Sequence, residues 1–266
     1  MGNVFTIFRK EVATFFNSLV GYIVLGAFVV LAGLFFWVFE GGALTSGLAN
    51  MDMLFGSAPY LFLFLIPAIT MGSFSEEQAN GTIETLMTKP VTDWQVILGK
   101  YFSAAFVVLI ALLPTLIYYM TLADLAEDPG NLAKTQASMD FLRNQEGPTY
   151  TTRLDHGPII GAYIGLFGLG LIFSAIGILA SALSRNQVVA FIIASLGSFV
   201  LFDGLTFFSE VEALQGVGVT ISRLGIASHF ESISKGVVDT RDVIYFLSAI
   251  AIFLLLTRLT LTLKRR

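Results

Sequence analysis

Long apolar runs alternate with short polar segments along the whole chain. No charged residue occurs between Glu11 and Glu40 or between Asp52 and Glu76, and similar runs follow Lys100 and His156. A helix needs about 20 apolar residues to cross the hydrocarbon core of a bilayer. This spacing therefore predicts an all-α polytopic membrane protein whose 266 residues form a single transmembrane domain. The six predicted transmembrane helices lie at about residues 19–39, 55–74, 98–122, 158–183, 188–208 and 242–262.

The segment before the first span has a different pattern. Apolar side chains recur there every three or four residues, while Arg9, Lys10 and Glu11 occupy other positions of the helical wheel. The apolar stripe consists of Phe5, Phe8, Val12, Phe15 and Leu19. This periodicity predicts an N-terminal amphipathic helix that lies in the cytoplasmic interface of the membrane. From the periodicity alone, we interpret the helix as a membrane anchor.

Composition and charge exclude several classes of function. Hydrophobic residues make up 55% of the chain and charged residues 13%, so the composition is not that of a soluble enzyme. The net charge of −4 lacks the basic excess that nucleic-acid binding requires, so no nucleic-acid partner is expected. The chain has no Cys, which excludes disulfides, thiolate metal sites and a cysteine nucleophile.

The distribution of Lys and Arg in the short loops predicts the orientation. Cytoplasmic loops of membrane proteins are enriched in these residues. With six spans, most of the basic residues next to span ends fall on one side, which we predict to be the cytoplasm, with both termini. They are Arg9, Lys10, Lys89, Lys100, Arg185, Arg258, Lys264, Arg265 and Arg266. The two long loops at about 124–157 and 209–241 are then external, and they carry most of the carboxylates.

The connection between the second and third spans has the most distinctive local signals. Gly81 breaks one turn, Thr82 is suited to cap a short helix, and Pro90 prevents that helix from continuing. A second helix start follows, with Thr92 or Asp93 as its cap. This layout predicts a short helix across the cytoplasmic ends of two spans, through which a cytoplasmic partner could push both.

The same connection resembles that of a known family. Ser75-Glu76-Glu77, Gly81-Thr82-Ile83-Glu84, Leu86, Pro90-Val91, Trp94-Gln95 and Gly99-Lys100 are similar to the loop of type-2 ABC transporter permeases, the ABC-2-type membrane subunits. The chain departs from that pattern at Gln78, where the family often has Arg. The stretch 228–242 resembles the subgroup linked to bacterial gliding motility, with copper-site maturation permeases as near relatives.

The resemblance implies a mechanism and partners. A permease of this type pairs with a separate ABC ATPase subunit and with a second permease copy or a related membrane subunit, in the bacterial inner membrane. The loop 76–93 then carries the coupling helix, near Thr82 to Lys89. The expected ATPase-coupling residues are Glu76, Glu77, Gly81, Thr82, Glu84, Thr85, Leu86, Thr88 and Pro90.

No phosphate-binding loop is present in the chain. Gly99-Lys100 is followed by Tyr101, and Trp94 stands where such a loop needs its first glycine. We therefore expect the chain not to be an enzyme and to hold no cofactor, with ATP and Mg²⁺ bound by the partner ATPase.

Few other residues suggest chemistry. Asp203 is the one unambiguous acid inside a predicted span, and its place near the outer end favours a satisfied or interface-facing carboxylate over a proton relay. His156 and His229 lack metal-ligand spacing, and we interpret each as a solvated or capping side chain. Gly161, Gly165 and Gly168 place small residues along one face of the fourth span, which predicts close helix packing. No catalytic or metal-ligating residue is predicted.

The sequence thus favours a permease subunit of an ATP-driven export or force-transmitting complex. An ion-coupled carrier or channel is the alternative from another class, but it would be expected to have several ionisable groups inside the membrane. A membrane scaffold that moves nothing is a third reading, because a coupling loop can also serve as a docking loop.

Overall fold

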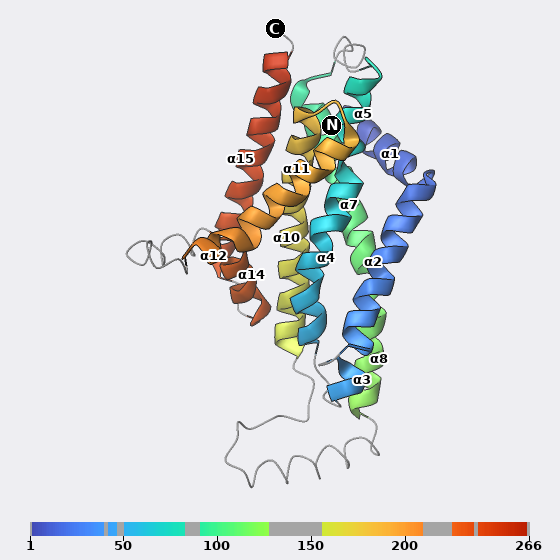
Figure 1. Cartoon of the computed structure of the whole chain (residues 1–266), viewed down its shortest axis with the longest axis vertical. Helices are drawn as coiled ribbons and strands as arrows, with labels where there is room; N and C mark the ends of the chain where they lie inside the picture. The colour runs from blue at the N-terminus through green and yellow to red at the C-terminus, as the bar shows by residue number, and fades with distance from the viewer. Residues whose placement is uncertain are drawn as a thin grey trace.

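The computed structural model describes residues 2–39, 42–46, 51–82, 91–127, 156–209, 225–236 and 239–264. All regular structure in these segments is helical, and six helical stretches are long and apolar enough to cross a membrane (Figure 1). The predicted all-α fold with six spans is therefore confirmed.

The helices follow one another in an elongated bundle (Figure 1). The elements are α1 (Gly2–Phe16), α2 (Leu19–Trp37), α3 (Ala43–Ser46), α4 (Asp52–Thr70), α5 (Gly72–Ala79), α7 (Asp93–Leu112), α8 (Thr115–Glu127), α10 (His156–Leu183), α11 (Gln187–Phe199), the π-helix η1 (Val200–Gly204), α12 (Leu205–Ser209), α14 (Ile226–Ser234) and α15 (Thr240–Lys264). The helix of the second span begins earlier and ends later than predicted, and so does that of the third.

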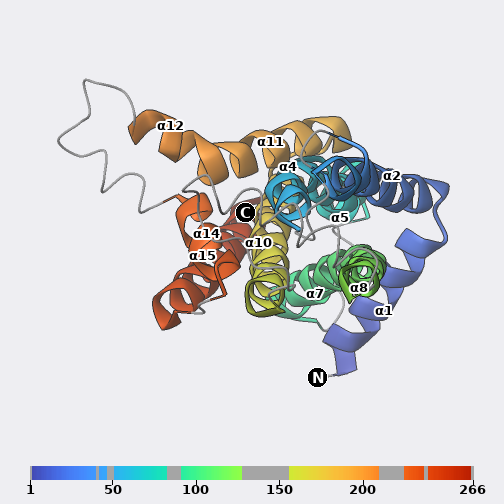
Figure 2. The same ribbon diagram turned by 90° about the horizontal axis from the view of Figure 1, so that it is seen from below.

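Helix α10 forms the centre of the bundle. It packs against α4, α7, α11, α14 and α15, and Figure 2 shows it among them in the view along the bundle. Its glycines allow the close approach. A Cβ at Gly161 would lie 2.5 Å from the carbonyl oxygen of Ile233 on α14, and one at Gly168 would lie 2.9 Å from the ring of Phe246 on α15. The predicted packing role of this small-residue face is confirmed.

Three of the spans are interrupted. The second bends at Met71, between α4 and α5, and the third breaks before Pro114, between α7 and α8. Pro114 explains the second of these breaks, because proline has no amide hydrogen to donate to the carbonyl four residues earlier and its ring crowds the preceding turn. The fifth span widens into the π-helix η1 before it ends in α12.

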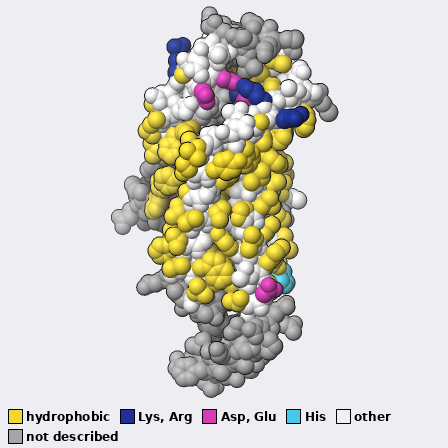
Figure 3. Space-filling model, turned by 90° about the vertical axis from the view of Figure 1, so that its right-hand side faces the viewer, with side chains coloured by type: hydrophobic (Ala, Val, Ile, Leu, Met, Phe, Trp, Pro, Cys, Tyr) yellow, Lys and Arg dark blue, Asp and Glu magenta, His cyan; other side chains and the backbone are white. Residues whose placement is uncertain are grey.

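The outer helices present apolar side chains to the surroundings. Less than a third of the apolar window of α2, of the α11–α12 span or of α15 is buried, whereas α10 is mostly buried. On the face that is turned toward the viewer in Figure 3, hydrophobic side chains form a broad band, and most of the visible charged side chains lie near the upper end. Gly2 and Lys264, the first and last described residues, both lie toward that end (Figure 1). A bilayer is the environment that such a band requires.

Candidate functional site

The predicted site begins on a helix. Helix α5 continues the second span beyond the bend, and it carries Glu76 and Glu77. Gly81 ends it with φ +68°, in the left-handed region that glycine adopts without strain, so the predicted break is confirmed. The amide and the hydroxyl of Thr82 both donate hydrogen bonds back to the carbonyl of Glu77.

The chain re-enters the bundle through a well-capped helix. Thr92 is the N-cap of α7: its hydroxyl accepts a hydrogen bond from the amide of Gln95, and the Gln95 side chain accepts one from the amide of Thr92. This capping box satisfies two amide groups at the helix start. It also confirms the second helix start predicted at Thr92 or Asp93. We call α5, residues 80–82 and residues 91–100 the elbow.

A buried lysine holds the elbow together. The ammonium group of Lys100 donates hydrogen bonds to Glu11 at 3.0 Å, to Glu77 at 2.9 Å and to the carbonyl of Ser73 at 2.6 Å. It also lies 5.1 Å from the ring centroid of Phe74. Only 2% of the Lys100 side chain is exposed. One charge thus joins three helices, since Glu11 is on α1, Glu77 is on α5 and Lys100 is on α7.

The charges of this cluster balance. Lys10, which is mostly exposed, lies 3.6 Å from both Glu11 and Glu77, so two cations face two anions. A buried ion pair contributes little net stability, but the loss of one partner leaves a buried charge uncompensated, at a cost of about 3–5 kcal/mol. Separating α1, α5 and α7 is therefore costly, and a force applied to the elbow acts on all three helices together.

The amphipathic helix α1 consequently does more than anchor the chain. It packs along α7, and Ile7 sits so close to Gly99 that a Cβ there would lie 2.7 Å from the Ile7 side chain. Glu11, which the helical wheel placed away from the apolar stripe, turns toward Lys100. The interpretation of α1 as a mere anchor is wrong.

A serine on the central helix stabilises the bend of the second span. The hydroxyl of Ser181 accepts hydrogen bonds from the amides of Phe74 and Ser75, at 2.8 and 3.0 Å, and donates one to the carbonyl of Met71 at 2.8 Å. Ser181 is fully buried. The first-turn amides of a helix lack partners within that helix, so this side chain on α10 completes α5 and ties it to the core.

Gln78 connects the elbow with the last turn of α15. Its amide nitrogen donates to the carbonyl of Ala182 at 3.1 Å, while its oxygen accepts a 2.6 Å hydrogen bond from Lys264. Lys264 also donates to the carbonyls of Ala182 and Leu183, at the end of α10. An arginine at position 78 could not accept this bond. Gln78, which stands where the family often has Arg, thus has a hydrogen-bond partner in Lys264 at the end of α15.

The structure places part of the predicted site. Glu76, Glu77, Gly81 and Thr82 lie in or next to the elbow. The remaining predicted coupling residues, Glu84, Thr85, Leu86, Thr88 and Pro90, lie outside the described residues, as does nearly all of the predicted coupling helix. Sequence reasoning did not assign roles to Glu11, Lys100 and Ser181. The sequence did contain a signal for the Lys100 cluster. It was a lysine two turns inside a membrane helix, together with a carboxylate on a neighbouring amphipathic helix.

Asp203 has a partner within the apolar part of the bundle. It lies in η1, and one of its carboxylate oxygens accepts a 2.8 Å hydrogen bond from the hydroxyl of Tyr60 on α4. The prediction of a satisfied carboxylate is confirmed. Tyr60 lies eight residues into α4, about 12 Å from its start at 1.5 Å per residue. The pair therefore sits well inside the span and not at its outer boundary.

The histidines differ from expectation. His229 on α14 bonds to Asp242 on α15 at 2.7 Å and stacks on Tyr245 at a centroid separation of 3.9 Å, so its interpretation as a solvated or capping residue is wrong. The contact arises because α14 folds back against α15. His156 is exposed and bonds to the hydroxyl of Tyr119. Among the described residues, no group of three or more His, Asp or Glu side chains is placed to hold a metal ion.

The chain matches a known protein family. The sequence profile of a family described as ABC-2 family transporter protein matches residues 5–261, which is nearly the whole chain. No curated protein matches the chain in sequence.

Proposed function

Because the chain belongs to the ABC-2 family of transporter proteins, we propose that its elbow receives the movement of a separate ATPase subunit. Membrane subunits of this family lack ATPase activity and generally pair with an ATPase. The loop 76–93 is then the coupling segment, and ATP and Mg²⁺ are bound by the partner. The elbow and both termini lie on the cytoplasmic side of a bacterial inner membrane, and a second permease copy or a related subunit completes the transporter.

The buried Lys100 cluster is the observation that carries this proposal. A coupling segment must transmit force to membrane helices, and Lys100 joins the interfacial helix α1 to α5 and α7 through bonds of about 3 Å. Ser181 and Gln78 extend the connection to the central helix α10. Movement of the loop thus displaces four helices, whereas a docking loop on a static scaffold has no need of a buried charge network.

The ion-coupled carrier is less well supported. A carrier is expected to have several ionisable groups within the membrane. Among the residues that the structure describes, a single acid, Asp203, lies in the interior of a span. Its carboxylate is bonded to Tyr60. Lys100 lies at the elbow, where its charge is balanced by Glu11 and Glu77.

The link to gliding motility rests on residues 228–242 alone. In the structure this stretch forms most of α14 and the first turn of α15, apart from residues 237 and 238, which lie outside the described residues. The family match covers the stretch without supporting that subgroup. We keep force transmission in a gliding complex as a specific hypothesis within the broader permease function.

The test is site-specific crosslinking to a candidate ABC ATPase subunit from the same genome. A photoreactive amino acid replaces Thr85 in the loop or, as the control, Asp124 at the other end of the bundle. The expected result is a crosslink to the ATPase from position 85 and none from position 124. A stable complex that crosslinks from neither position, or equally from both, would overturn the assignment.

Coupling itself is tested by ATP hydrolysis in lipid nanodiscs. Glu84→Arg and Thr85→Arg should release the ATPase or uncouple its hydrolysis from the permease. If both variants bind and stimulate the ATPase as the native chain does, the loop is not the coupling segment. The scaffold hypothesis would then be favoured.

A further inference from the structure

The basic residues at the elbow end of the bundle fall into two groups. Lys10 and Lys100 face the carboxylates of the elbow, so their charges are compensated within the chain. Among the residues that the structure describes, neither Arg185 nor Lys264 forms an ion pair with a carboxylate. Cations that are not compensated within the protein attract anions from the surroundings.

Arg185 and Lys264 lie beside each other, although they come from different parts of the chain. The ammonium group of Lys264 donates hydrogen bonds to the carbonyls of Ala182 at 2.7 Å and Leu183 at 3.2 Å, at the end of α10. Arg185 follows two residues after that end, and its positive charge acts on the ammonium group of Lys264. Two neighbouring cations repel each other, and an anion that lies beside both relieves this repulsion.

Local hydrogen bonds fix the backbone at both positions. Arg185 lies in the turn between α10 and α11, where the hydroxyl of Ser184 accepts a 3.0 Å hydrogen bond from the amide of Asn186. The side chain of Asn186 in turn caps the start of α11. Lys264 is in the last turn of α15 and uses its ammonium hydrogens on oxygen atoms of the protein. It therefore supplies charge, whereas the exposed guanidinium group of Arg185 is placed to donate hydrogen bonds to a ligand.

Apolar side chains at the surface surround these two cations. Leu183 at the end of α10, Val188 at the start of α11 and Leu263 at the end of α15 are 49%, 63% and 60% exposed. Both α11 and α15 pack against α10, so the three side chains belong to adjoining ends of membrane helices. A phospholipid is complementary to this arrangement, because its phosphate fits the planar fork of an arginine and its acyl chains cover apolar surface.

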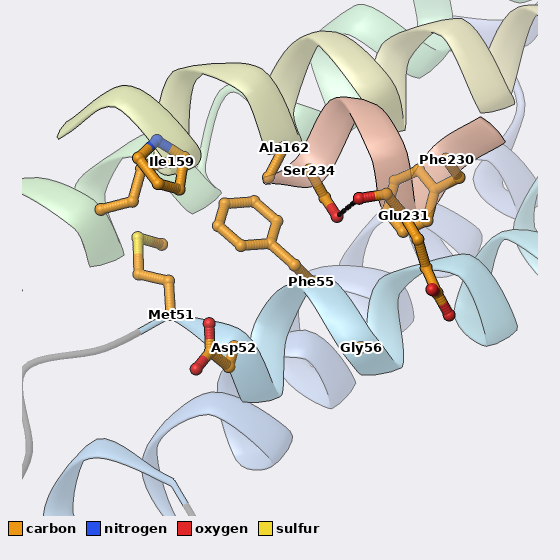
Figure 4. Close-up of a pocket in the computed structure, with 10 residues that line it drawn as sticks. Met51, Asp52, Phe55, Gly56, Ile159, Ala162, Phe230, Glu231 and Ser234 are labelled. Atoms are coloured by element: carbon orange, nitrogen blue, oxygen red, sulfur yellow. Dashed lines mark hydrogen bonds between the residues drawn. The ribbon is translucent and has the colours of Figure 1, made fainter. Parts of the chain in front are cut away.

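The opposite end of the bundle has a different charge character. A pocket between α4, α10 and α14 is lined there by Asp52 and Glu231, with no Lys or Arg among its described lining residues, and Figure 4 shows Phe55 of α4 projecting between the helices. An anionic headgroup is therefore not expected at that end. Residues 230–234, which include part of the pocket wall, provide an internal reference for the test below.

We propose that Arg185, with the charge of Lys264 beside it, binds the headgroup of an anionic phospholipid. Clusters of Lys and Arg next to the end of a membrane helix attract such lipids, and the sequence adds Arg265 and Arg266 directly after Lys264. The acyl chains lie along the exposed apolar side chains at the ends of α10, α11 and α15. The bound headgroup thus connects the turn between α10 and α11 with the last turn of α15, next to the bond between Gln78 and Lys264.

The test is photolabelling of the full chain in phosphatidylcholine nanodiscs. The probe is phosphatidylglycerol with a diazirine at the start of one acyl chain, and the matched probe is phosphatidylcholine with the same diazirine, which carries a phosphate but no net charge. We expect phosphatidylglycerol to label residues 183–189 and 259–264 more strongly than phosphatidylcholine does, as mapped by mass spectrometry. At residues 230–234 phosphatidylglycerol should have no such advantage.

Substitutions of Arg185 distinguish this site from the general attraction of a basic surface. Arg185→Gln should lower the preference for phosphatidylglycerol about fivefold, and the exposed position of the side chain makes a folding defect unexpected. Arg185→Lys keeps the charge and should retain most of the preference. Arg9→Gln is the matched control, because it removes an exposed cation from α1, and it should leave the preference unchanged.

Equal labelling of these residues by the two lipids would overturn the proposal, and so would an unchanged preference in Arg185→Gln. If Arg9→Gln lowers the preference as much as Arg185→Gln does, the attraction belongs to the whole basic surface and not to this site. If inorganic phosphate abolishes the preference, the site takes the free ion instead of a lipid. The assay needs neither ATP nor an ATPase, so its failure leaves the coupling proposal unaffected.

Discussion

The elbow and the opposite end of the bundle hold their helices together in different ways. At the elbow, Lys100 is buried between Glu11 and Glu77, and each carboxylate has a cation within 3.6 Å. At the opposite end, α10 and α14 meet through the close approach of Gly161 to the carbonyl oxygen of Ile233. Charge compensation holds the helices of the elbow together, whereas small residues and apolar packing hold α10 and α14 together. The two ends of one bundle are thus stabilised by different interactions.

Loss of the central cation should have the largest effect. Lys100→Met leaves Glu11 and Glu77 with the mostly exposed Lys10 as their one cation, 3.6 Å from each, and we expect a loss of about 3–5 kcal/mol of stability. The measurement is thermal unfolding of the purified chain in nanodiscs. The triple variant with Glu11→Gln and Glu77→Gln should recover most of the loss. An unchanged unfolding temperature in Lys100→Met would mean that the cluster does not hold the elbow.

The bend of the second span should show the next largest effect. Ser181→Ala leaves the buried amides of Phe74 and Ser75 without their partner, which should lower stability by about 2 kcal/mol. Hydrogen exchange of those two amides, followed by mass spectrometry, should quicken. Ser248→Ala is the control, because the hydroxyl of Ser248 is exposed and bonds to a carbonyl of its own helix. Equal effects of the two changes would contradict this role of Ser181.

Packing of α10 against α14 should show an effect of similar size. In Gly161→Ala the new methyl group clashes with the backbone of α14, 2.5 Å from the carbonyl oxygen of Ile233, and overpacking of this kind costs about 1–3 kcal/mol. Gly26→Ala adds the same methyl group in open space, and it should be neutral or slightly stabilising. The two unfolding temperatures distinguish a specific α10–α14 contact from a general sensitivity to helix glycines.

The smallest effect is expected within the membrane. Tyr60→Phe removes the hydroxyl that bonds to Asp203, and side-chain hydrogen bonds between membrane helices average about 0.6 kcal/mol. The double change with Asp203→Asn should show whether the two effects are coupled. If the stability effects of the two changes are strictly additive in this double-mutant cycle, the hydrogen bond contributes nothing to the stability of the native state.

The sequence was sufficient for the features that depend on local pattern. Apolar length predicts the six spans, Gly81 ends α5, and Thr92 caps α7, because each signal lies within a few residues of its effect. The Lys100 cluster depends on three segments, with Glu11 separated from Lys100 by 89 positions, and no local period encodes that contact. Lys100 instead marked the edge of a charge-free run, which placed the start of the third span too late.

The contacts among α10, α14 and α15 also depend on residues that are far apart in the sequence. Spacing along α10 predicts a face of small residues, but it does not say that α14 and α15 fill that face. His229 was misread for this reason: its partner Asp242 lies 13 positions away on a different helix, and the fold-back of α14 brings them together. The partner of Asp203 is 143 positions away, on α4.

The bond between Gln78 and Lys264 has a consequence for how the protein is made. The two residues are 186 positions apart, and Lys264 lies in the last turn of α15. All members of the Lys100 cluster have been synthesised once the third span begins, whereas Lys264 is added only with the last turn of α15, 186 positions after Gln78. The elbow is therefore assembled in two stages, and its contact with Lys264 forms only after α15 has been made and inserted.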